Sequence, residues 1–189
     1  MKIISKNNRY IEEDVVLGRI DHLIEHRVPW LMVGLLVGLL SAVMVSKFHA
    51  ILSENVQLAY FIPIIVYLSD AVGTQTETIY IRTLSKNKKI NLYKYIAKES
   101  AIGLGLGISS GLILAVFAML WMNSFEIGLV IGLSMIVNLT LAPVLATFIP
   151  SLLYKRKSDP ALGSGPLATI IQDLISLLVY FTIAGIVIL

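Results

Sequence analysis

Three acidic residues occur inside long apolar stretches of this sequence: Asp70, Glu77 and Asp173. An ionised carboxylate at the centre of a lipid bilayer costs about 3 kcal/mol, so a chain that keeps one there needs a compensating interaction. The stretches around these acids contain no Lys or Arg that would pair with them. A bound cation is therefore the counter-charge that we expect.

Hydroxyl-bearing residues follow the acids at helical spacing. Asp70, Thr74 and Glu77 stand at positions i, i+4 and i+7, which share one face of a helix. Thr169 stands four residues before Asp173 and shares its face. Carboxylates, hydroxyls and carbonyls suit hard cations, so the residue types indicate magnesium, calcium or manganese.

Asp70 and Asp173 are expected at the same depth in a membrane. At about 1.5 Å per helical residue, each lies about 20 Å from the nearer end of its apolar stretch. Two helices would then bring two carboxyl groups to one layer, which predicts a shared cation site.

Each of these residues also has a structural interpretation. Asp173 can be a protonated acid that is hydrogen-bonded to another helix, and Asp70 can play a similar part. Glu77 is near enough to the following polar loop to extend towards water. Threonines in such helices often bond neighbouring helices rather than ions.

The elements that carry these residues are apolar helices. Of the 189 residues, 57% are hydrophobic and only 14% are charged, whereas soluble domains carry about 25% charged residues. A helix crosses the hydrocarbon layer with about 20 apolar residues. We therefore predict an all-α membrane protein with five transmembrane helices, at residues 29–46, 56–84, 98–122, 125–154 and within 160–189.

The basic residues predict the orientation of these helices. All but one of the 15 Lys and Arg residues fall in the N-terminal segment, the loop after the second predicted helix or the loop after the fourth. Basic loops stay in the cytoplasm, so the N-terminus is predicted inside and the C-terminus outside. We expect a multi-pass protein of the cell membrane.

Two domains are predicted. Residues 1–28 form a cytoplasmic segment with an amphipathic helix at 8–27, and residues 29–189 form the membrane domain. The run Gly-Ser-Gly-Pro at 163–166 is expected to interrupt the last helix and free backbone carbonyls. Glycines spaced four apart, such as Gly103 with Gly107 and Gly128 with Gly132, predict close helix packing.

Several functions are excluded or disfavoured. The absence of cysteine excludes disulfides, thiolate metal sites and cysteine nucleophiles. No glycine-rich phosphate loop occurs, and nucleic-acid binding is not indicated, because the basic residues are explained by the loops. An intramembrane hydrolase with Asp70 and Asp173 as its acid pair lacks a supporting motif. We expect no enzymatic activity and no cofactor.

The sequence resembles the transmembrane domain of the MgtE magnesium channels over residues 27–189. The matching residues are Arg27, Pro29-Trp30-Leu31, Pro63, Gly73-x-Gln75, Ile81-Arg82-x-Leu84, Asp159-Pro160-Ala161, Ser164-Gly165-Pro166, Thr169, Asp173 and Tyr180-Phe181. No counterpart of that family's N-terminal and CBS regulatory domains is expected here.

The resemblance implies a homodimer of five-helix subunits with a pore at the dimer axis. The acid that matches Asp173 holds a hydrated magnesium ion there, and the backbone near Thr169 and polar groups of the second helix complete the site. The helix at 8–27 resembles a linker helix that plugs the pore.

One motif departs from the family. The usual Gly-Gly-Asn-x-Gly-x-Gln is replaced by Ser69-Asp70-Ala71-Val72-Gly73-Thr74-Gln75, so Ala71 takes the place of asparagine in the expected site. The extra acids leave Ca²⁺, Mn²⁺ or Co²⁺ as alternatives to Mg²⁺, and coupling to H⁺ or Na⁺ stays open. A non-conducting accessory or scaffold subunit is the alternative of another class.

Overall fold

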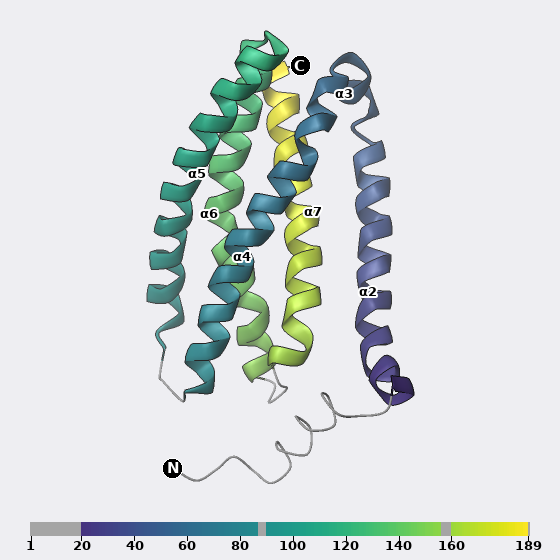
Figure 1. Cartoon of the computed structure of the whole chain (residues 1–189), viewed down its shortest axis with the longest axis vertical. Helices are drawn as coiled ribbons and strands as arrows, with labels where there is room; N and C mark the ends of the chain where they lie inside the picture. The colour runs from purple at the N-terminus through teal and green to yellow at the C-terminus, as the bar shows by residue number, and fades with distance from the viewer. Residues whose placement is uncertain (1–19, 87–89, 156–159, 189) are drawn as a thin grey trace.

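A computed structural model describes residues 20–86, 90–155 and 160–188. Within these ranges the chain is helical and forms no strand, so the predicted all-α class is confirmed. The elements in chain order are α2 (Ile20–Ser46), α3 (His49–Glu54), the 3-10 helix η1 (Val56–Phe61), α4 (Ile62–Ser85), α5 (Leu92–Met122), α6 (Phe125–Lys155) and α7 (Pro160–Ile188) (Figure 1).

Four stretches of helix are long and apolar enough to cross a membrane: Val56–Ser85, Leu92–Met122, Phe125–Lys155 and Leu167–Ile188. A fifth, shorter apolar helix covers Leu31–Ser46 within α2. These stretches match the five predicted transmembrane helices in number and order. The predicted orientation of the helices relative to the cell stays a prediction.

The first apolar stretch lies where it was predicted. Its apolar part is Leu31–Ser46, against a predicted 29–46, and it belongs to α2, which is described from Ile20 and carries Pro29 inside it. Residues 8–19 of the predicted amphipathic helix at 8–27 lie outside the described residues. Its last part, from Ile20, is continuous with α2.

The predicted interruption at 163–166 is wrong, because α7 runs as one helix from Pro160 to Ile188. A proline in the second turn of a helix removes only one backbone hydrogen bond, and the rest of the helix can form around it. Glycine weakens a helix but does not prevent it. The site residues of α7 therefore lie on one continuous helix.

α6 is the central helix of the bundle. Of the residues in its most apolar stretch, 56% are buried inside the bundle, compared with 28% in each of the other three candidate spans. It lies against α4, α5 and α7. Through α6, the two helices that carry the predicted site acids, α4 and α7, are held in fixed positions.

The predicted glycine packing is confirmed between α5 and α6. A Cβ atom on Gly103 would overlap the carbonyl oxygen of Leu139, and one on Gly111 would lie 2.8 Å from the carbonyl oxygen of Gly132. Pro143 has no N–H, so the Leu139 carbonyl four residues earlier lacks its usual helical partner. Gly103 lets α5 approach that carbonyl closely.

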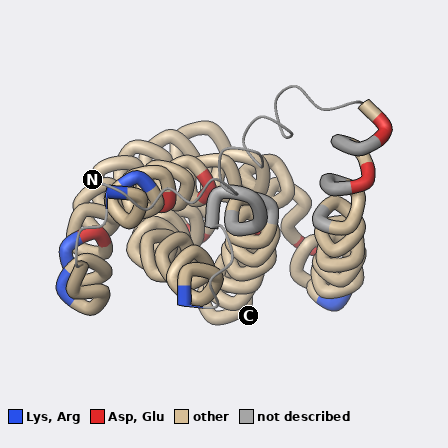
Figure 2. The backbone as a smooth tube through the Cα atoms, turned by 90° about the horizontal axis from the view of Figure 1, so that it is seen from below, with Lys and Arg blue, Asp and Glu red and all other residues tan. Residues whose placement is uncertain are grey.

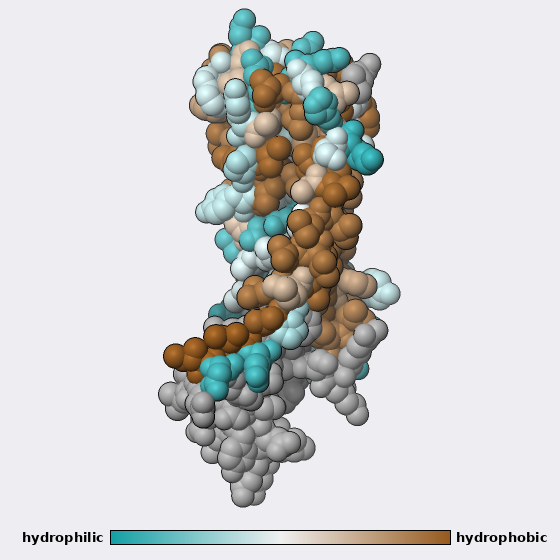
Figure 3. Space-filling model, turned by 90° about the vertical axis from the view of Figure 1, so that its right-hand side faces the viewer, coloured by the Kyte–Doolittle hydropathy of each residue, from teal (hydrophilic) through white to brown (hydrophobic). Residues whose placement is uncertain are grey.

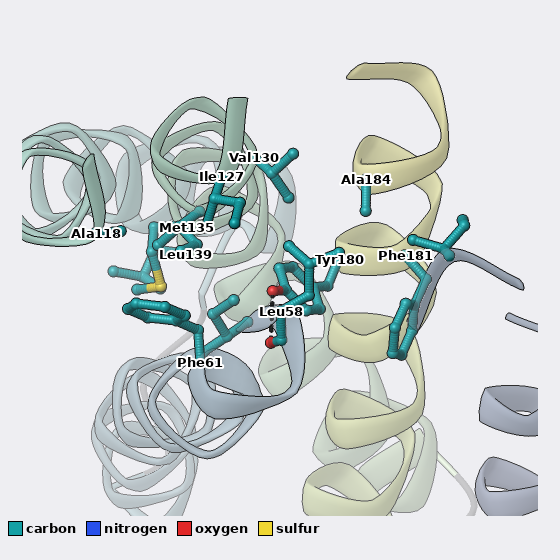
Figure 4. Close-up of a cluster of buried hydrophobic side chains, with 13 residues drawn as sticks. Leu58, Phe61, Ala118, Ile127, Val130, Met135, Leu139, Tyr180, Phe181 and Ala184 are labelled. Atoms are coloured by element: carbon teal, nitrogen blue, oxygen red, sulfur yellow. Dashed lines mark hydrogen bonds between the residues drawn. The ribbon is translucent and has the colours of Figure 1, made fainter. Parts of the chain in front are cut away.

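A cluster of buried side chains anchors the end of the bundle where η1 lies (Figure 4). The Tyr180 hydroxyl donates a hydrogen bond of 2.8 Å to the backbone carbonyl of Leu58. Both residues are fully buried. This contact ties η1 to α7 and so fixes where α4 begins.

α2 stands at the side of the bundle and packs mainly against α7. Figure 3 shows apolar side chains along the face it presents. The exposed leucines on α2 include Leu35, Leu36, Leu39 and Leu40. In a membrane such a face contacts lipid or another helix.

Basic residues gather at one end of the bundle, which we call the basic end: Arg82, Lys86, Lys94 and Lys155 (Figure 2). α4 and α6 end there, and α5 and α7 begin there (Figure 1). The helix ends that flank the two basic loops thus lie at the same end of the bundle.

Candidate cation site

Three of the predicted site residues of α4, Asp70, Thr74 and Glu77, lie on one side of that helix. They border a single pocket, the inner pocket, with residues of the two neighbouring helices. Its lining is Asp70, Gly73, Thr74 and Glu77 of α4, Ala146 of α6, and Ala168, Thr169 and Gln172 of α7. The spacing i, i+3, i+4 and i+7 on α4 is the helical stripe that the sequence predicted.

The inner pocket is small and lined with oxygen donors. Its cavity volume is about 10 Å³ for the centre of a water-sized sphere. That is room for about one water molecule. Carboxylate, hydroxyl and amide oxygens surround it, which is the donor set of a hard cation.

The lining residues differ in how open they are. Thr74 is exposed, Asp70 and Thr169 are half-buried, and Glu77 is only 7% exposed. Glu77 also interacts with other residues of the chain. The pocket therefore has an open side at Thr74 and a buried side at Glu77.

Asp173 lies beside this pocket rather than in its wall. It is half-buried on α7, and its carboxyl group interacts electrostatically with that of Asp70. The two acids are thus near each other although they belong to two different helices, and their depth in a membrane stays a prediction. Asp70 belongs both to the pocket wall and to the surroundings of Asp173.

Ala71 is half-buried and does not border the pocket. Its methyl side chain offers no oxygen ligand. A part for Ala71 in ion binding stays a prediction that rests on the motif alone.

The sequence analysis missed Gln172. Its side chain is 3% exposed, and its amide nitrogen donates to Ser176 Oγ at 3.5 Å. Its Oε1 is buried without a hydrogen-bond partner. An amide side chain in the middle of an apolar helix already indicates a site residue, although the neighbouring Asp173 gives the stronger indication.

Asn138 and Tyr80 are polar residues of α6 and α4 that hydrogen-bond one helix to another. Asn138 Nδ2 donates to the backbone carbonyl of Ser176 at 3.3 Å, and Tyr80 Oη lies 2.7 Å from Ser151 Oγ. These contacts bond α6 to α7 and to α4. They are helix-bonding contacts and lie outside the pocket wall.

The described residues of one chain do not supply a complete carboxylate cage. In the part of the chain that the structure describes, no three His, Asp or Glu side chains converge on one point. A cation at Asp173 must therefore be held largely through water, by carbonyl and hydroxyl oxygens, or by a second subunit.

A model of the MgtE family, described as a divalent cation transporter, matches residues 62–183 of the chain. The chain belongs to the MgtE family. The match covers α4, α5 and α6 and most of α7, so it includes every helix that borders the inner pocket.

Curated MgtE relatives support the same assignment. The chain is 36% identical over 161 residues to "Magnesium transporter MgtE" of Bacillus subtilis and 35% identical to the protein of that name from Enterococcus faecalis. It is 29% identical to the one from Thermus thermophilus. These matches cover 84% of this chain but only 35% to 36% of each relative.

The MgtE assignment confirms the family resemblance and the multi-pass membrane architecture. The relatives are named as transporters, and no enzymatic activity is indicated by their names. The chain spans little more than a third of each relative. The ion, the pore and the ion-site residues therefore belong to the proposal that follows.

Proposed function

We propose that this chain transports hydrated divalent cations, Mg²⁺ first among them, through a pore at the axis of a homodimer. Asp173 is the main acid of the ion site. Asp70 adds negative charge beside it, and Thr169 and Thr74 orient water molecules around the ion. The observation that carries the proposal is that the Asp70 and Asp173 carboxyl groups, on α4 and α7, are near enough to repel one another.

The exposure of Asp173 supports a site at a subunit interface. It is half-buried within one chain, so one side of the residue is open to a partner or to water. A second copy would bring a second Asp173, and two half-sites would make the cage that one chain lacks. Isologous dimers place the same residue on both sides of the axis in this way.

The charges favour a divalent ion in its hydrated form. Mg²⁺ gives up its water reluctantly and is usually held by one or two carboxylates with several waters retained. Asp173 and Asp70 with nearby hydroxyls suit that mode of binding. A membrane potential of 100 mV, negative inside, would favour inward movement by about 2.3 kcal/mol per charge.

Flux into liposomes tests the proposal. The purified chain should admit Mg²⁺ to vesicles that contain a Mg²⁺-sensitive dye, and Asp173→Ala should abolish that flux. Glu126→Ala is the matched control, because Glu126 is exposed at the opposite end of the bundle from the basic end. Flux that survives in Asp173→Ala at the level of the control would refute the site.

Competition in the same assay identifies the ion. Mg²⁺ entry is expected to be inhibited most by ions that bind the site better than Mg²⁺ does. Ca²⁺, Mn²⁺ and Co²⁺ are the ions to compare, because the extra acids of α4 can favour any of them. Vesicles that admit none of the four ions would indicate a non-conducting membrane subunit instead.

A further inference from the structure

Gln172 carries an unusual combination of burial and unmet hydrogen bonding. The side chain is 3% exposed, yet its Oε1 has no hydrogen-bond partner. Buried polar atoms in folded proteins nearly always have one, so an orphan of this kind needs an explanation. Since Gln172 lines the inner pocket, a ligand there would supply the missing partner.

The orphan oxygen lies beside Gly73. A Cβ atom placed on Gly73 would be 3.7 Å from Gln172 Oε1 and 3.8 Å from the Cβ of Ala146. Gly73 thus leaves the space next to the oxygen open, and any side chain there would reduce it. The amide oxygen and the glycine are thus neighbours in the wall of the pocket.

We propose that the inner pocket is a second divalent-cation site, internal to each subunit and separate from the ion at Asp173. The cation would contact Asp70 and Gln172 Oε1 directly, in the space that Gly73 leaves open. This proposal rests on the proposed transport of divalent cations. It adds a site that a single subunit can form.

The size of the pocket decides which form of the ion enters. With room for about one water molecule, it has no space for the water shell of a hydrated ion. Mg²⁺ keeps several of its waters, whereas Ca²⁺ accepts many direct oxygen ligands in flexible geometry. Mn²⁺ accepts the same carboxylate and carbonyl donors. The inner pocket therefore favours Ca²⁺ or Mn²⁺ over Mg²⁺.

Asp70 links this site to Asp173. It lines the pocket, and its carboxyl group interacts electrostatically with Asp173. A cation in the pocket would neutralise the negative charge that Asp70 contributes near Asp173. It would therefore weaken the binding of the ion at Asp173. Ca²⁺ or Mn²⁺ would then inhibit Mg²⁺ transport from a position beside the pore.

Mn²⁺ binding to the purified full chain in lipid nanodiscs tests the proposal. Electron paramagnetic resonance reports free Mn²⁺, so a titration counts the bound ions and their affinities. The wild type should bind Mn²⁺ in two classes of sites. Asp173→Asn should remove one class and keep the other, which we assign to the inner pocket.

Gly73→Ala is the decisive variant. The added methyl meets its neighbours at ordinary contact distances of 3.7 Å or more, so the fold should tolerate it. It fills the space beside Gln172 Oε1 and should weaken the pocket class of Mn²⁺ sites at least tenfold. Gly105→Ala is the matched control, because a Cβ on Gly105 would meet nothing within 4 Å.

Gln172→Glu provides an independent check in the opposite direction. It keeps the shape of the side chain and replaces the amide with a carboxylate, so it should bind Mn²⁺ in the pocket more tightly. A wild type with a single class of sites would overturn the proposal. So would identical isotherms for Gly73→Ala and Gly105→Ala, or unchanged affinity in Gln172→Glu.

The proposal can fail separately from the proposed function. If Mg²⁺ flux requires Asp173 but only one class of Mn²⁺ sites exists, the transport proposal stands and the inner site is refuted. If Asp173→Ala leaves flux intact while the pocket class responds to Gly73→Ala, the inner site stands and the pore site is refuted.

Discussion

Asp70 on α4 and Asp173 on α7 interact electrostatically, although 103 residues separate them in the sequence. The two helices run in opposite directions, α4 towards the basic end and α7 away from it (Figure 1). α6 lies against both of them. Two carboxylates held this close in an apolar bundle are tolerable when a cation lies between or beside them.

Replacing Asp70 should weaken ion binding without abolishing transport. Asp70→Asn keeps the shape of the side chain and removes one negative charge next to Asp173. We expect the apparent affinity for Mg²⁺ to fall about tenfold, which corresponds to about 1.4 kcal/mol of lost attraction. Initial rates of liposome flux over a range of Mg²⁺ concentrations measure it.

The effect of Asp70→Asn should be smaller than that of Asp173→Ala. If the two variants abolished flux equally, Asp70 would be a second main acid of the site. If Asp70→Asn matched the wild type, the electrostatic contact with Asp173 would have no part in binding the ion.

Gly103 should be the glycine that tolerates substitution least. A methyl group there would overlap the carbonyl oxygen of Leu139 and push α5 away from α6. Gly103→Ala should lower the free energy of unfolding by about 1–3 kcal/mol, which is typical of overpacking. Unfolding in increasing denaturant, followed by circular dichroism, measures the change.

Gly105→Ala, two residues away on the same helix, is the control for that experiment. Its added methyl would meet no atom within 4 Å, so stability should stay the same or rise slightly. Equal losses in the two variants would mean that the close approach of α5 to α6 is not what requires Gly103.

The hydrogen bond from Tyr180 to Leu58 should contribute to stability and not to ion selectivity. Tyr180→Phe removes the hydroxyl and leaves the buried Leu58 carbonyl without its 2.8 Å donor. We expect a loss of about 1 kcal/mol in the free energy of unfolding. The order of preference among Mg²⁺, Ca²⁺ and Mn²⁺ in flux assays should stay as in the wild type.

Tyr67→Phe serves as the comparison, because Tyr67 is 68% exposed. It should leave stability almost unchanged. A change of ion preference in Tyr180→Phe would show that η1 and α7 influence the site directly rather than through the fold.

The positions of the helices were largely predictable because a membrane span needs a long apolar run. Apolar composition located the helices that end at Ser46, Ser85, Met122 and Lys155 within a residue of their observed ends. It placed the first apolar stretch at 29–46, and the apolar part of α2 is Leu31–Ser46. Composition also predicted that Gly and Pro at 163–166 interrupt the last helix, whereas α7 continues through them.

The candidate site was predictable as far as helical spacing reaches. The spacing of Asp70, Thr74 and Glu77 placed them together, and the pocket contains all three. Gln172 could not be selected in this way, because the place of its oxygen beside Gly73 depends on how α7 packs against α4. Contacts between helices follow from their rotation and packing, which the sequence pattern leaves open.

The most direct test of the central claim uses the absence of cysteine from the chain. In a Thr169→Cys variant, with Asp173 intact, a water-soluble cationic thiol reagent should label Cys at this position, and Mg²⁺ should slow the labelling. The protection by Mg²⁺ should disappear when Asp173→Asn is added. A thiol that never reacts, or protection by Mg²⁺ that persists without the Asp173 carboxylate, would contradict an ion path at Asp173.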